Sequence, residues 1–229
     1  MLKIALIPSI FLFFGIISII YAAAVHYFLK VKDHQAVQYW SLGSLIWGCA
    51  ILLTIFRQEL PLFLSYFIAN GVAFVAYVVM NRALRCLLEE IRNSFKFGLI
   101  YVGIFVLYTC ALFALSLWTP NEFSDLAKTT FVSALVVVVS LQGAQYCYLI
   151  SVKHKLKIAQ NFAYLYLLVA FLWSARIISA AAFQATHAFD PGLLNTVIWV
   201  AMFITGVVKY MIFPLMLLQK NEKEKFNII

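Results

Sequence analysis

The sequence predicts an all-α integral membrane protein: a bundle of seven transmembrane helices with the N-terminus outside and the C-terminus in the cytoplasm. Apolar residues make up 65% of the 229 residues and charged residues 11%, whereas about a quarter of the residues in a soluble domain are charged. The mean hydropathy is +0.96. Apolar runs approaching the ~20 residues that a span needs recur seven times. We therefore expect a single membrane domain over residues 1–229.

The first three spans are expected at 4–29, 37–56 and 60–81. The first run ends in small residues, as a signal peptide does, but it exceeds the usual apolar region of ~7 to 15 residues, so we expect a retained helix. Pro61 suits the first turn of a helix, so the second and third spans should form a hairpin. Arg57 in its turn is expected to be an interfacial base. The third helix should continue past the bilayer to a break near Asn93.

The remaining spans are expected at 97–118, 128–152, 161–186 and 193–219. Pro120 should end the fourth helix, because the residue before a proline is pushed out of helical geometry. A loop is expected at 121–125. Asp190, Pro191 and Gly192 form a turn signal before the last span. Residues 220–229 are expected to be a short cytoplasmic tail.

Lysine and arginine residues predict the orientation, since short loops rich in them stay in the cytoplasm. One side of the expected bundle carries twelve of the seventeen bases: Lys30, Lys32, Arg82, Arg85, Arg92, Lys96, Lys153, Lys155, Lys157, Lys220, Lys223 and Lys225. The other side carries three, Lys3, Arg57 and Lys128. The net charge of +8 is therefore a signal of membrane topology, and it does not point to nucleic acid.

Arg176 and Lys209 are the two bases expected inside spans, and all nine carboxylates are expected outside them. A cation at the bilayer centre costs ~2.5 to 3.5 kcal/mol and usually marks a functional or internally paired site. Arg176 lies roughly 15 Å from the outer end of its span at 1.5 Å per residue. It could bind a carboxylate or phosphate, with Trp173 one turn away as a wall. The alternative is a structural arginine satisfied by carbonyls or polar neighbours.

Lys209 in the seventh span also occupies the helix on which microbial rhodopsins attach retinal. Retinal bound to Lys209 is thus one alternative, although the protonated Schiff base would need a counter-ion and no carboxylate is expected at mid-membrane. A neutral lysine, or one that reaches the cytoplasm near Pro214, is the other alternative. No other cofactor is required by the sequence.

Neutral polar residues in the spans complete the candidate ligand site, because polar side chains in lipid favour the bundle interior. Asn70 is expected at the same depth as Arg176. The same residues could instead be interhelical glue that needs no ligand. Tyr166 and Trp199 are expected in the interfacial belts. The candidate ligand-binding residues are Arg176, Asn70, Gln142, Lys209, Trp173 and Gln145.

Metal and catalytic signatures are missing from the sequence. The four cysteines, Cys49, Cys86, Cys110 and Cys147, have no metal-ligand spacing, and the histidines are scattered near the ends of spans. No nucleotide-binding glycine loop, nucleophile elbow or zinc-protease helix motif occurs. We therefore expect no metal site and no enzyme activity.

The hairpin of the second and third spans carries a family-like set of residues: Trp40, Gly43, Arg57, Pro61, Ser65, Ala69, Asn70 and Gly71. With these residues, the stretch 39–88 resembles the N-terminal multi-helix membrane sensor region of bacterial GGDEF-type diguanylate cyclases and sensor histidine kinases. This resemblance implies a location in the bacterial inner membrane and a sensor function. No GGDEF or kinase sequence follows residue 219, so the output would come from a partner or from an effector domain that was removed.

The leading hypothesis is a membrane-embedded receptor that binds a small, lipidic or anionic ligand and signals to a cytoplasmic protein, alone or as a homodimer. A different class is a small transporter or channel subunit, in which the cations inside the spans would line a path. Transporters of this size are often built from repeats, and no internal repeat is evident. A retinal-type protein or a structural assembly partner remains a further alternative.

Overall fold

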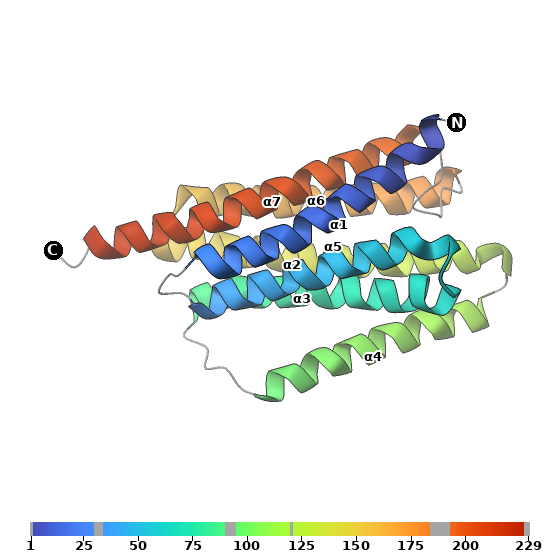
Figure 1. Cartoon of the computed structure of the whole chain (residues 1–229), viewed down its shortest axis with the longest axis horizontal. Coiled ribbons are helices and arrows are strands. Elements are labelled where there is room, and N and C mark those ends of the chain that lie inside the picture. Colours follow the sequence, from blue (N-terminus) through green and yellow to red (C-terminus); the bar gives the residue numbers. More distant parts are fainter. Residues whose placement is uncertain (1, 30–33, 90–94, 120, 184–192, 227–229) are drawn as a thin grey trace.

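The seven-helix architecture is confirmed. The structure is a computed structural model that describes residues 2–29, 34–89, 95–119, 121–183 and 193–226. In these ranges seven helices are long and apolar enough to cross a membrane. They form one elongated bundle (Figure 1). In chain order the helices are α1 (Leu2–Phe28), α2 (His34–Ile55), α3 (Ala69–Leu88), α4 (Phe95–Trp118), α5 (Asn121–His154), α6 (Lys157–Phe183) and α7 (Leu193–Phe226).

Helices adjacent in sequence pack against one another, and α7 closes back on α1 while α3 contacts α5. Helix α4 lies at the periphery (Figure 1), and of its described side chains only Tyr108, Thr109 and Leu112 are buried. We call the end of the bundle that holds the connection between α2 and α3 the turn end. The opposite end, which holds Arg85 and Lys153, is the basic end. Helix α7 projects beyond its neighbours at the basic end (Figure 1).

The third span does not begin as the regular helix that Pro61 predicts. A short 3-10 turn, η1 (Phe56–Gln58), is followed by a π-helical segment, η2 (Phe63–Ile68), which leads directly into α3. The hydroxyl of Ser65 donates a hydrogen bond to the Pro61 carbonyl at 3.3 Å. Such segments are rare, and they are frequent at functional sites because the extra residue per turn redirects side chains.

One other expectation about the ends of the helices is wrong. The loop expected at 121–125 is the start of α5, which begins at Asn121. Proline is tolerated just before a helix begins, so Pro120 need not be followed by a loop. The tail expected from residue 220 is helical as far as Phe226, because α7 continues past its apolar run. The expected break near Asn93, the expected end of the sixth span at 186 and the turn signal at 190–192 lie outside the described residues.

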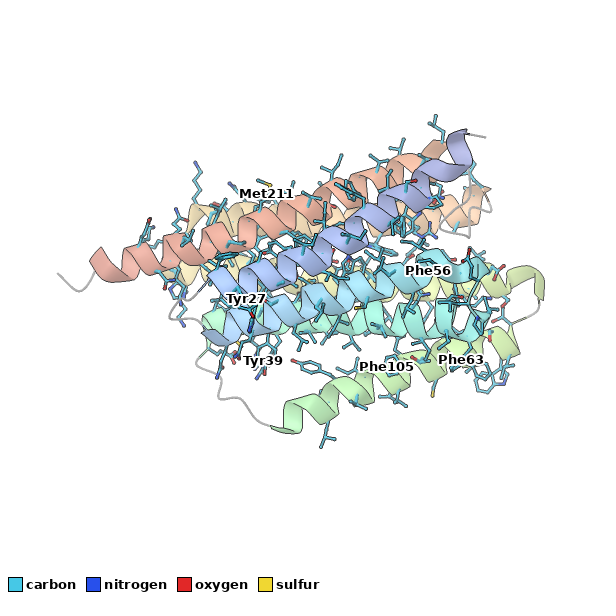
Figure 2. All side chains as sticks on the ribbon, viewed as in Figure 1. Tyr27, Tyr39, Phe56, Phe63, Phe105 and Met211 are labelled. Atoms are coloured by element: carbon cyan, nitrogen blue, oxygen red, sulfur yellow. The ribbon has the colours of Figure 1, made fainter. Side chains whose placement is uncertain are left out.

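Aromatic stacking fills the half of the bundle nearer the basic end. Trp40 of α2 stacks on Phe213 of α7 with ring centroids 4.1 Å apart. Its indole N–H donates to the Tyr21 hydroxyl of α1 at 3.0 Å. These contacts join three helices in one core cluster. Apolar side chains such as Met211 and Phe63 cover the outside instead (Figure 2), as expected of a surface that faces lipid.

Candidate functional site

A cavity of about 160 Å³ lies inside the bundle, and all seven helices contribute to its wall. Most of the wall is aromatic or aliphatic. Among the described residues that line it, three are basic and none is acidic: Arg57, Arg176 and Lys209. The cavity is therefore an apolar space with an excess of positive charge, and a negatively charged occupant would complement it.

Arg176 on α6 is held from the side of α7. Its guanidinium donates a hydrogen bond from Nη1 to Oδ1 of Asn195 at 2.9 Å, and it lies 4.8 Å from the ring centroid of Trp199. Arg176 is 5% exposed and Asn195 1%. A guanidinium has five N–H donors in a planar fork, so it can bind an oxyanion in addition to Asn195 and its other contacts.

Two basic side chains lie beside Tyr66 of the π-helical segment, at the turn end of the cavity. The guanidinium of Arg57 lies 4.8 Å from the Tyr66 ring centroid and the ammonium of Lys128 lies 5.5 Å from it. Lys128 is paired with Asp125 at 2.6 Å. Arg57, which we expected to be an interfacial base, lines the cavity together with Tyr66. Two arginines, Arg57 and Arg176, therefore lie in the neighbourhood of Tyr66 at the turn end.

Lys209 on α7 lies deeper in the bundle, in an aromatic enclosure. Its Nζ is 4.2 Å from the ring centroid of Tyr166 on α6 and 5.1 Å from that of Tyr77 on α3. Lys209 is 5% exposed, and no carboxylate lies among the described lining residues. The two ring faces supply cation–π attraction, worth up to about 2 kcal/mol each when desolvated. They supply no hydrogen-bond acceptor, so an oxygen-bearing ligand would bind well here.

Two polar atoms of the cavity wall have no hydrogen-bond partner among the described residues. They are the Ser133 hydroxyl on α5 and the Trp199 indole N–H on α7. Buried polar groups in native proteins are nearly always satisfied, by protein, water or a ligand. These two donors therefore favour an occupied cavity, with water or with a polar ligand.

The sequence-predicted site residues divide into two groups. Asn70, Trp173, Arg176 and Lys209 line one cavity. The Asn70 amide donates to the Tyr66 carbonyl at 2.7 Å, one turn back in its own helix. The candidates on α5 lie outside the cavity and are exposed: Gln142 and Gln145. Gln142 accepts a 3.4 Å hydrogen bond from Asn81, so it links α3 to α5.

The belt positions expected for Tyr166 and Trp199 are wrong, because Tyr166 is fully buried and Trp199 lines the cavity. A periodic signal could have identified both. On α6 the inward face repeats at intervals of three and four residues, the period of one helix face: Tyr166, Val169, Trp173 and Arg176. On α7 the same intervals give the second inward face: Asn195, Trp199, Met202, Gly206 and Lys209.

The site can be compared with known proteins only through its chemistry. Its parts are the buried Arg176 and the half-buried Arg57 at the turn end, a mostly apolar middle and the buried Lys209. Searches against protein families, curated proteins and solved structures find no match to this chain.

Proposed function

We propose that this chain is a receptor module of the bacterial inner membrane that binds a small, lipidic or anionic ligand in the cavity and signals to a cytoplasmic partner. The observation that carries this proposal is the cavity itself. Arg176 is buried on its wall, and the surrounding wall is aromatic and has no acidic residue among those described. A permanently charged guanidinium in such a place is costly unless an anion or fixed dipoles compensate it.

Contacts at the basic end provide a route for the signal. The Lys153 ammonium at the end of α5 donates to the Leu88 carbonyl at the end of α3, and Nε2 of His154 lies 3.2 Å from the Leu87 carbonyl. Lys223 of α7 donates to the Lys155 carbonyl at 2.6 Å. Basic side chains favour the carbonyls at helix C-termini. A movement of α3 or α7 at the cavity would therefore change contacts that face the proposed cytoplasmic partner.

Decanoate, a lipidic anion, is a suitable probe for the full chain purified in phosphatidylcholine nanodiscs. Trp47, Trp173 and Trp199 line the cavity, so their fluorescence should change saturably on binding. We expect Arg176→Ala to weaken binding at least tenfold with unchanged helical circular dichroism. The matched control is Arg85→Ala, because Arg85 is an exposed arginine paired with Glu89 outside the cavity. Equal binding by Arg176→Ala and the wild type would refute the proposal.

Two alternatives have less support. A transporter needs a path for its solute through the whole bundle. Toward the basic end, the described side chains around Trp40 and Phe213 pack in a core cluster that would have to open. A protonated Schiff base of retinal on Lys209 would need a counter-ion, and no carboxylate lies among the described residues that line the cavity. Solute flux in liposomes would favour the first alternative. Visible absorbance after retinal is added, lost in Lys209→Ala, would favour the second.

A further inference from the structure

The three basic residues of the cavity lie at two levels. The turn-end level contains Tyr66, Arg176 and Trp199, together with Arg57 beside Tyr66. The deep level contains Lys209 between the rings of Tyr77 and Tyr166. Both levels are formed by side chains from the same three parts of the bundle: the η2–α3 segment, α6 and α7.

The spacing between these levels follows from the sequence separation along each helix. On α6 it runs from Tyr166 to Arg176 and on α7 from Trp199 to Lys209, ten residues in each case. At 1.5 Å per residue this corresponds to about 15 Å. The η2–α3 segment, from Tyr66 to Tyr77, gives a similar length. Because the Lys209 side chain slants toward the N-terminus of α7, its ammonium lies nearer the arginines, at roughly 10 to 15 Å.

Most side chains that line the space between the levels are apolar. Residues of both levels line the same cavity, so one extended chain could reach from one level to the other. Val136, Val169 and Met202 are among the side chains that line this middle section. Charged or polar groups of a ligand would be poorly solvated there, so polar ligand atoms belong at the two ends.

We propose that the ligand is a linear dianion: one acidic group binds Arg57 and Arg176 at the turn end, an apolar chain fills the middle, and a second acidic group binds Lys209. This inference rests on the proposed function and names its ligand class. Three cations without a described acidic residue on the wall favour two negative charges over one. The unpartnered donors of Ser133 and Trp199 add hydrogen bonds for the oxygen atoms.

Linear acids of matched length test the proposal on the full chain in nanodiscs, followed by tryptophan fluorescence. Sebacate is the dianionic probe, decanoate is its counterpart with one acidic group, and glutarate is a diacid too short to reach both levels. We expect sebacate to bind at least tenfold more tightly than decanoate and glutarate. Lys209→Met should remove that advantage and leave decanoate binding within about twofold. The matched control is Lys157→Met, because Lys157 is exposed and outside the cavity.

The outcomes separate this inference from the proposed function. If decanoate binds and sebacate binds no better, the dianion is wrong and the receptor proposal stands. If Lys209→Met weakens both probes equally, Lys209 does not contact a second acidic group, and the dianion is again wrong. If no acid binds to the wild-type protein, both proposals fail. The comparison of sebacate with glutarate uses the unmodified chain, so a folding defect in a variant cannot obscure the result.

Discussion

Removing the side chain of Asn195 should destabilise the ligand-free bundle through Arg176. The Arg176 guanidinium donates to Asn195 Oδ1 at 2.9 Å, and both residues are almost fully buried. Asn195→Ala deletes the acceptor and leaves a buried cation with fewer partners. The loss should therefore exceed that of a neutral hydrogen bond in a membrane protein.

Two values bracket the magnitude. Hydrogen bonds between helices in a membrane contribute on average about 0.6 kcal/mol, with a maximum near 1.7. Hydrogen bonds to charged groups contribute ~1.5 to 3 kcal/mol. Because this bond is short, charged and buried, we expect a coupling energy of about 1.5 kcal/mol between Arg176 and Asn195, which is close to a tenfold change in the unfolding equilibrium.

A double-mutant cycle measures this energy. The four proteins are the wild type, Arg176→Met, Asn195→Ala and the double variant, each unfolded reversibly in mixed micelles by a denaturing detergent. The cycle is needed because both residues have further contacts that single substitutions also remove. A coupling energy below about 0.3 kcal/mol, within the usual error of additivity, would refute the inference that α6 and α7 are joined by this bond.

Three other predictions concern packing, capping and orientation. Gly143→Ala places a Cβ 2.5 Å from the Tyr166 ring, so it should lower the stability of the protein by about 1 to 3 kcal/mol, which unfolding measures. Because Tyr166 also encloses Lys209, the same substitution should weaken sebacate binding. Lys153→Ala should cost about 0.3 to 1 kcal/mol and speed amide exchange at the end of α3, because the Leu88 carbonyl loses its donor. A cysteine in place of Glu59, in a chain without its native cysteines, should react with an impermeant maleimide from the periplasmic side.

Each of these predictions has a matched control and a contrary outcome. A Cβ at Gly103 meets nothing within 4 Å, so Gly103→Ala should be neutral or slightly stabilising. Equal effects of the two glycine substitutions would contradict the packing argument. Lys157→Ala should leave exchange at the end of α3 unchanged, and acceleration there would contradict the role of Lys153. A cysteine in place of Glu222 should be protected from the maleimide in intact cells. Labelling of this cysteine would contradict the expected orientation, with the C-terminus in the cytoplasm.

Part of the candidate site was predictable from single residues. Arg176 and Lys209 are recognisable because a base within an apolar run is rare and costly, whatever the fold. Asn70 could be predicted as a site residue because it lies as many residues from the outer end of its span as Arg176 does from the end of its own. Gln142 and Gln145 could not be excluded in this way, because depth does not say which side of α5 faces the cavity. The buried stripe on that helix passes through Ser133, Ser140 and Cys147.

The turn end shows a different kind of failure. Arg57 has the sequence context of an interfacial base at a tight turn, and as a base in a turn it would normally face headgroups. The π-helical segment places the Tyr66 ring close to both Arg57 and Lys128, and Arg57 lines the cavity beside it. Nothing in the residues Phe63–Ile68 marks a π-helix, since its extra residue per turn is stabilised by contacts with other helices.

The sequence by itself determined that this is a membrane protein and where its spans lie. In lipid, a run of about 20 apolar residues can satisfy its backbone hydrogen bonds within itself only by forming a helix. Only the tertiary structure decided which side chains meet inside the bundle. Lipid is as apolar as a leucine side chain, so hydrophobicity alone does not fix the rotation of a helix about its axis. Close packing, as between Gly143 and Tyr166, fixes that rotation, and it brings Lys209 and Arg176 to one cavity.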